Sequence, residues 1–364
     1  MKKQLFEFIP EKSLNLVNYS GKELISRLGE ELISNVVLSI LCGDNVRNLT
    51  ERFTQRRILL MNTSLLITYI KALSSYENLS EVLTELVNKE VHKPRIDQNT
   101  KRYLLWFVGL TGKSIQNVIR EKEEFNNYLT RLDKNLSDIK TEVEDLYGDI
   151  TISGTNEGYN FLLKWNDLLR CMLAIGASTL SIRGSEKSMY GKLFEKFVMG
   201  SALSILGFQY VNRDDTRNSN IFWLSERQNK RESDATALLK PGYGIRFDIG
   251  FIGVGNTEVS LDKVTRFDHL MERNQINNNT VTIILIDKIG SNSRIYEMAK
   301  EIGGYIIQMS GTYWVYELAK TIHSIYPFYN NPILSMTKEE SLDYLKEKMK
   351  GINLADFLTT PIAL

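Results

Sequence analysis

The chain has few of the residues that build disulfide-linked or histidine-based sites. Its 364 residues include two cysteines, Cys42 and Cys171, and three histidines. Two cysteines are too few for a disulfide framework or a cysteine-rich zinc site. The histidines are scattered, without the H-E-x-x-H spacing of a zinc protease, and no G-x-S-x-G nucleophile elbow occurs. We therefore expect both cysteines to be buried, apolar residues.

The sequence also lacks a long apolar run and an excess of one charge. Its most apolar windows, such as residues 280–287, are far shorter than the ~20 residues needed to span a bilayer. Charge and proline interrupt the N-terminal segment too early for a signal peptide. The 45 basic and 44 acidic residues nearly balance, so no global field demands a polyanion or a membrane surface. We expect a cytoplasmic protein, in which a basic cleft would be a local feature.

What is present is typical of a globular protein with more than one core. Hydrophobic residues make up 43% and charged residues 24%, and 364 residues are many for one compact domain. The first half reads as helical, because apolar residues recur there at three- and four-residue spacings. The windows are residues 22–41, 56–73, 78–89 and 101–110, and a charged stretch at 119–147 predicts an exposed helix or helical hairpin. We expect a helical domain over residues 1–180.

The second half alternates between strand and helix patterns. A helix is predicted at 191–207, with Gly207 as its C-terminal stop. Short apolar runs predict strands at 208–211, 220–226, 244–253, 280–287 and 305–310, with helices at 260–274 and 293–304. The last two strands should be parallel, joined by a crossover helix. We therefore expect an α+β or α/β domain over residues 181–364, in which helices flank a mixed sheet.

The stretch FDIGFIGVGNTEVSLDK, residues 247–263, carries both glycines and acids. A dinucleotide loop needs a third glycine where Glu258 stands, and a carboxylate there would repel the pyrophosphate. A second glycine-rich candidate, Gly112-Lys113-Ser114, has Phe107 where a Walker A loop needs glycine. Both nucleotide-binding interpretations fail on spacing.

The acids of the same stretch favour a metal site. Asp248 points away from Phe247 and Ile249 by strand alternation. A turn at 254–256 lets the chain return antiparallel and bring Glu258 close to Asp248. Two converging carboxylates are costly unless a cation lies between them, and Mg²⁺ accepts one or two carboxylates with waters and phosphate oxygens. The alternative is that both acids are solvated residues flanking a hairpin.

A helix with a glutamate, then a strand with an aspartate, then a hairpin to a further glutamate resembles the PD-(D/E)XK nuclease core. Residues 231–267 further resemble type II restriction endonucleases of the CfrBI type, and the likeness extends over about residues 185–310. The resemblance implies Mg²⁺-dependent hydrolysis of double-stranded DNA at a short palindromic site by a homodimer. It also leaves two rivals: an inactive nuclease-like DNA-binding protein, and a nuclease acting on structured or single-stranded nucleic acid.

The resemblance implies roles for individual residues. Asp248 matches the metal-binding aspartate, Glu258 the acid of the E-x-K element and Glu195 the helical glutamate. The pattern departs at Ser260, where a lysine is expected, and Lys263 could reach the site on its flexible stem instead.

Asp234, in a strand-like segment just upstream, competes for the metal-ligand role. If its strand is central in the sheet, Asp234 and Asp248 would form the pair and Glu258 would lie further out. We favour Asp248 with Glu258.

Contacts to DNA should come from arginine and asparagine side chains, which pair with guanine and adenine edges in the major groove. The candidates are Arg213, Arg217, Asn218, Asn220 and Arg231. Basic clusters at residues 52–57, 92–102 and 227–231 could contact phosphates, although each could equally be a solvated face.

Overall fold

The computed structural model describes residues 3–18, 23, 25, 29–111, 122–211, 218–225, 233–251, 279–288 and 304–358. The chain forms two compact units that interleave along the sequence. The first unit comprises Met1–Tyr19 and Arg52–Lys187, and the second comprises Ser20–Glu51 and Ser188–Leu364. The helical domain predicted over residues 1–180 and the α+β or α/β domain predicted over residues 181–364 stay predictions.

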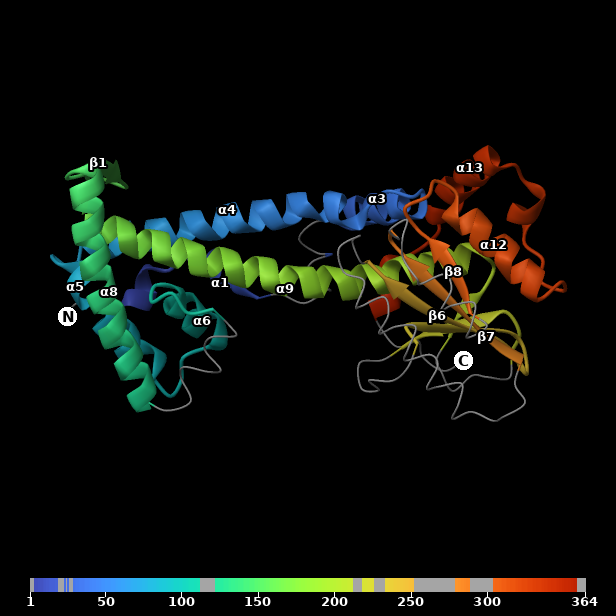
Figure 1. The fold of residues 1–364 in the computed structure, drawn as a ribbon, viewed down its shortest axis with the longest axis horizontal. Coiled ribbons are helices and arrows are strands. Elements are labelled where there is room, and N and C mark those ends of the chain that lie inside the picture. The colour runs from blue at the N-terminus through green and yellow to red at the C-terminus, as the bar shows by residue number, and fades with distance from the viewer. Residues whose placement is uncertain are drawn as a thin grey trace. The chain divides into compact units, whose positions relative to one another are not determined.

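The first unit is mainly helical (Figure 1). Its elements are η1 (Leu5–Phe8), α1 (Glu11–Val17), α5 (Leu79–Val91), α6 (Gln98–Trp106), α8 (Lys122–Tyr147), β1 (Thr151–Asn156) and β2 (Tyr159–Lys164), with most of α4 (Val46–Leu73) and the first part of α9 (Trp165–Ile205). Buried leucines and aromatics, among them Tyr69, Tyr103 and Phe107, form its core. The predicted helical windows are confirmed in α4, α5, α6 and α8.

Two features of this unit were missed by the sequence analysis. The first is the antiparallel hairpin of β1 and β2, whose signal was the turn at Glu157-Gly158. Both residues have positive φ, 49° and 86°, as a two-residue type I′ turn requires. The second is the length of α9, which begins at Trp165 and not near residue 191. Its predicted end is confirmed, since the helix stops at Ile205 and Gly207 follows with a φ of 89°.

The second unit contains the mixed sheet that the sequence predicts. Its six strands lie in the order β3-β4-β5-β6-β7-β8. They are β3 (Gln209–Tyr210), β4 (Ile221–Leu224), β5 (Ala235–Lys240), β6 (Tyr243–Gly250), β7 (Asn279–Ile286) and β8 (Tyr305–Gln308). The β4-β5-β6 part is antiparallel, whereas β6, β7 and β8 are parallel and lie side by side (Figure 1). The predicted parallel pairing of β7 with β8 is therefore confirmed.

Besides the end of α9, the described helices of the second unit include α3 (Glu30–Leu41), α12 (Trp314–Ile325), η2 (Pro332–Ser335), α13 (Lys338–Met349) and η3 (Leu354–Leu358). Of these, α3 comes from the N-terminal half of the sequence. The indole of Trp314 donates a hydrogen bond to the carbonyl of Ile40 at 2.8 Å. A Cβ on Gly43, whose φ is 102°, would lie 2.7 Å from the backbone of Gly311. The end of α3, predicted at Gly43, is thus fixed against the segment after β8.

Several predicted elements lie outside the described residues. They are the hairpin turn at 254–256 and the helices at 260–274 and 293–304.

Within the described ranges, no helix is long and apolar enough to cross a bilayer. Cys171 is buried as expected, and burial together with nearby Asp167 raises the pKa of its thiol to about 12. Cys42 is only half-buried.

Candidate active site

Strand β6 is buried on one face and half-exposed on the other. Ile245, Phe247 and Ile249 are completely buried, while Arg246 and Asp248 between them are half-exposed. Alternate residues of a strand point to opposite faces, so Asp248 points away from the apolar face, as the sequence predicts. Asp248 therefore lies on the half-exposed face of β6, which pairs with β5 on one side and β7 on the other.

The turn between β5 and β6 sets the register that places a second acid beside Asp248. Pro241 and Gly242 form this turn, and Gly242 has a φ of 85°, which a type II turn needs at its third position. Beyond a register shift between Leu238 and Lys240, Ala235 pairs with Phe247. Continued by one residue beyond Ala235, the same register would set Asp234 opposite Asp248.

The register shift decides which face Asp234 occupies. Without it, the pairing of Lys240 with Tyr243 would continue to Ala235 with Asp248 and set Asp234 opposite Ile249. Because a slip of one residue turns every side chain to the other face, Asp234 would then not share a face with Asp248. With the bulge, the continued register sets the two acids on the same face of the sheet.

Asp234 is held at the junction of three strands. Its Oδ2 accepts a hydrogen bond from the backbone amide of Ile249 at 2.8 Å, and its backbone carbonyl accepts one from Ser225 at 3.0 Å. Ser225 directly follows β4, and Ile249 lies on β6. A carboxylate has about four acceptor positions, so these contacts orient the Asp234 side chain without using its capacity to bind a cation.

A buried aspartate, which the sequence analysis did not single out, fixes the neighbouring strand end. Asp287 follows β7 and is 2% exposed. Its backbone amide donates to the carbonyl of Gly250, and its Oδ2 accepts from Nδ2 of Asn45 at 2.7 Å. Asn45 lies in the turn after α3, so this turn is tied to the end of β6, two residues beyond Asp248. The available signal was an acid ending an all-apolar strand, at the edge where ligands of parallel sheets bind.

The remaining predicted residues are spread over other places. Glu195 is half-buried on α9, in the same unit as the sheet. Asn218 and Asn220 are exposed before β4, and the amide of Asn220 donates to the carbonyl of Leu239 near the end of β5. Five residues of strand, about 16 Å, separate that position from Asp234. Glu258, Lys263, Arg213, Arg217 and Arg231 lie outside the described residues.

The chemistry of the described donors fits a hard divalent cation in part. In the described portion of the chain, no group of three histidine, cysteine or acidic side chains is close enough to form a complete metal cage. Two carboxylates on one sheet face, with water or phosphate oxygens completing the shell, are nevertheless the ligands that Mg²⁺ uses.

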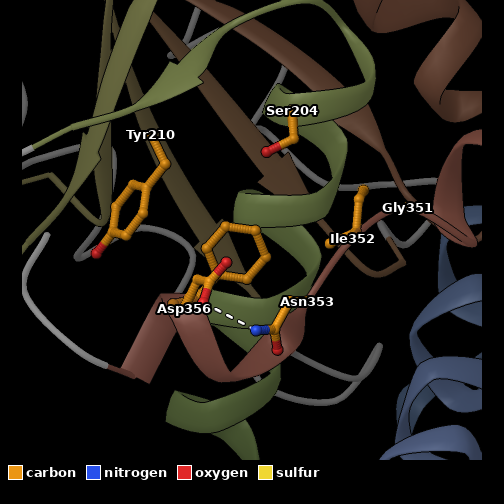
Figure 2. Close-up of a pocket in the computed structure, with 7 residues that line it drawn as sticks. Ser204, Tyr210, Gly351, Ile352, Asn353 and Asp356 are labelled. Atoms are coloured by element: carbon orange, nitrogen blue, oxygen red, sulfur yellow. Dashed lines mark hydrogen bonds between the residues drawn. The ribbon is translucent and has the colours of Figure 1, made fainter.

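A separate hollow of about 360 Å³ in the second unit lies beside η3 and contains none of the predicted site residues. Figure 2 shows Ser204 and Tyr210 on one side of it and Asn353 bonded to Asp356 on the other, at 3.0 Å. Its lining has one acid and no basic side chain, so it offers no counterpart to a nucleic acid.

Comparison with known proteins identifies the family. The family model described as CfrBI restriction endonuclease matches residues 30–294. The chain belongs to the CfrBI restriction endonuclease family. The type II restriction enzyme CfrBI of Citrobacter freundii is 36% identical over 318 residues, which cover 86% of this chain and 87% of that protein. No solved structure matches the chain. The resemblance and the activity expected from the sequence are thereby confirmed: this CfrBI-family member is a restriction endonuclease, which cleaves DNA at a specific site.

Proposed function

We propose that this CfrBI-family enzyme hydrolyses phosphodiester bonds of double-stranded DNA with Mg²⁺ held by Asp234 and Asp248. The observation that carries the proposal is the register of β5 and β6, which, continued by one residue beyond Ala235 and Phe247, would set these two half-exposed acids opposite each other. Two adjacent carboxylates repel each other unless a cation neutralises them. The alternative weighed in the sequence analysis thus gains support over Asp248 with Glu258 alone. Glu258 remains a predicted third ligand.

The order of elements supports a PD-(D/E)XK core. Helix α9 with Glu195 precedes the antiparallel strands β4, β5 and β6, and the parallel strand β7 follows. The hairpin at 254–256, on which the resemblance also rests, lies outside the described residues. The proposed role of Glu195 is to accept a hydrogen bond from a water in the metal shell.

Each protein group has one task in the proposed reaction. Mg²⁺ at this site would lower the pKa of a bound water and neutralise charge on the scissile phosphate. Asp234 and Asp248 hold the cation on a strand pair whose register is fixed by a turn and a bulge. The contacts of Asp287 keep the end of β6 in place, so that the carboxylate of Asp248 does not have to be ordered at each turnover.

A positive side chain beside the phosphate is the remaining requirement. Lys263 is the sequence candidate, since Ser260 stands where a lysine is expected. The structure offers a second one. Arg246 lies on the same face of β6 as Asp248, two residues away. Its guanidinium forms no hydrogen bond or ion pair within the described part of the chain. A guanidinium binds phosphate through two parallel hydrogen bonds, so Arg246 could orient the scissile group in the place of the lysine.

Cleavage of both strands at a short palindrome suggests a two-fold symmetric dimer with one site per strand. The homodimer and the cytoplasmic location are proposals that follow from the restriction activity. Base contacts by Arg213, Arg217, Asn218, Asn220 and Arg231 are likewise proposals. The position of Asn220 at the far end of β4 from Asp234 argues for a contact outside the cleaved base pairs.

Incubation of the protein with phage DNA, with Mg²⁺ and separately with EDTA, tests the proposed function. Discrete fragments in the Mg²⁺ lane alone would support a site-specific, metal-dependent nuclease, and sequencing their ends would give the site. A smear would favour a nuclease for structured or single-stranded nucleic acid. Intact DNA in both lanes, from folded protein, would favour the inactive binding protein.

A further inference from the structure

The segment joining α5 to α6 in the first unit carries a concentration of positive charge. Residues 89–102, KEVHKPRIDQNTKR, contain five lysines and arginines and only two acids. Across the whole chain, basic and acidic residues nearly cancel. The basic cluster is therefore the kind of local feature that a balanced overall charge allows.

Both acids of this segment are engaged by backbone amides. Glu90 is 3% exposed and accepts hydrogen bonds from the amides of Leu5 and Phe6, at 2.6 and 3.0 Å. Asp97 caps α6 by accepting from the amides of Asn99 and Thr100, at 2.9 and 3.0 Å. These hydrogen bonds join both carboxylates to backbone amides and not to the lysines and arginines of the cluster.

The cations remain available to a ligand. Arg95 and Arg102 are exposed and Lys101 is half-exposed, and the side chains of these three residues form no hydrogen bond or ion pair within the described residues. Lys93 is anchored, because its ammonium donates to Oε1 of Gln4 and lies 5.0 Å from the centroid of the Phe6 ring. The neighbouring η1 adds one exposed acid, Glu7, and Lys3 lies just before this short helix, so these two offset each other.

Two of these cations, Lys93 and Arg95, line a hollow of about 350 Å³. It is lined by Gln4, Phe6, Lys93, Arg95, Ile96, Asp97 and Thr100. Side chains of fixed geometry, such as Lys93 and Thr100, form one part of the lining, and the exposed Arg95 forms another. The hollow thus combines amide and hydroxyl groups with two cations.

We propose that Lys93, Arg95 and Lys101 of the first unit form a contact site for the phosphate backbone of duplex DNA, whereas Asp234 and Asp248 belong to the second unit. The inference rests on the proposed function, which supplies a polyanion as substrate. Duplex DNA presents one negative charge per ~1.7 Å of its axis, and lysine and arginine contacts to it release bound counterions. Such contacts position the protein on DNA without reading the sequence.

The test uses two double variants of the full chain. Arg95→Gln/Lys101→Gln removes two cations of the proposed site. Arg131→Gln/Lys134→Gln is the matched control, since both residues are exposed on α8 of the same unit and form no hydrogen bond or ion pair within the described residues. Helix α8 carries seven acids against four basic residues, so a phosphate contact there is unfavourable. Thermal unfolding establishes that each variant folds.

Binding is measured by fluorescence anisotropy in EDTA over a range of salt concentrations. The probes are two duplexes of equal length, one with the site mapped from wild-type cleavage and one without. We expect the Arg95/Lys101 variant to bind both duplexes more weakly by the same factor. Each lost contact should also lower the slope of log affinity against log salt by ~0.9. The control should match the wild type.

The possible outcomes separate this inference from the proposed function. Wild-type affinity and slope in the Arg95/Lys101 variant, from an enzyme that still cleaves, would overturn the phosphate site alone. A loss confined to the duplex with the cleavage site would also overturn it, because that result indicates base reading. A wild-type protein that neither binds nor cleaves duplex DNA would overturn the proposed function and this inference together.

Discussion

Charged side chains differ in burial between the two compact units, as one example from each unit shows. In the first unit, Arg57 is 5% exposed and its guanidinium donates to Glu186 at 3.2 Å and to the carbonyls of Leu16 and Val17. In the second unit, Asp234 and Asp248 are half-exposed at one edge of the sheet. A buried charge with its bonds made inside the protein is committed to structure. Half-exposed acids can meet a cation and a substrate, and we therefore propose that the chemistry belongs to the second unit.

The comparison also corrects how basic residues are interpreted from sequence. Arg57 belongs to a basic cluster at residues 52–57, which the sequence analysis offered for phosphate contacts. Its burial and its bonds to α1 carbonyls show a structural residue instead. Arg52 and Arg56 of the same cluster are exposed, and in the cluster at 92–102 every lysine and arginine is exposed or half-exposed. Clustering of charge alone does not separate the two cases, whereas burial does.

The largest loss of cleavage activity should come from replacing Asp234 or Asp248. We expect Asp234→Asn to lower the cleavage rate by at least ~10²-fold, about 3 kcal/mol, because the loss of a metal ligand should exceed the loss of an outer-shell partner. The measurement is the initial rate on a duplex with the mapped site at saturating Mg²⁺.

Glu258→Gln is the companion to this variant. A smaller loss than that of Asp234→Asn would support Asp234 with Asp248 as the main pair. Near-wild-type activity of Asp234→Asn, with Glu258→Gln inactive, would restore the pairing favoured from the sequence.

The next effect is on the stability of the first unit. Arg57→Ala leaves Glu186 buried without its arginine, and we expect a loss of ~3–5 kcal/mol in the free energy of unfolding. Urea unfolding followed by circular dichroism measures it. The double variant Arg57→Met/Glu186→Leu removes both charges and should recover most of that loss. A single variant as stable as the wild type would show that this ion pair is not what orders the unit.

A smaller loss of stability is expected at the contact between the end of α3 and the segment after β8. Gly43→Ala introduces a Cβ 2.7 Å from the Gly311 backbone at a φ of 102°, and should cost ~1–3 kcal/mol. Gly29→Ala is the control, because Gly29 has a φ of 87° and no atom within 4 Å of the added Cβ. The difference between the two variants in thermal unfolding isolates the close contact. Equal effects would mean that backbone conformation alone explains the loss.

Local patterns allowed much of the sheet to be predicted. The alternation in GIRFDIGF placed Asp248 on the correct face, and the apolar run at 280–287 gave a central strand buried between β6 and β8. Both features depend on neighbouring residues in the sequence. A periodic pattern is enough to recover them.

The rest depends on contacts that local patterns do not encode. Asp234 shares a sheet face with Asp248 only if the register shifts between Leu238 and Lys240, and a slip of one residue would move Asp234 to the other face. The contact between Asn45 and Asp287 joins residues 242 apart in the sequence. The first part of α9 was missed, although an acid in its first turn was an available signal: Oδ2 of Asp167 accepts a hydrogen bond from the amide of Lys164 at 3.0 Å.

The most direct test of the central claim compares Asp248→Asn with the wild type on DNA. Both proteins are assayed for Mg²⁺-dependent cleavage and for duplex binding in EDTA, with thermal unfolding as the control for folding. The account predicts that the variant loses cleavage while its affinity in EDTA and its unfolding midpoint stay at wild-type values. Full cleavage by the variant, or a joint loss of folding and binding, would contradict a catalytic role for the paired acids of β5 and β6.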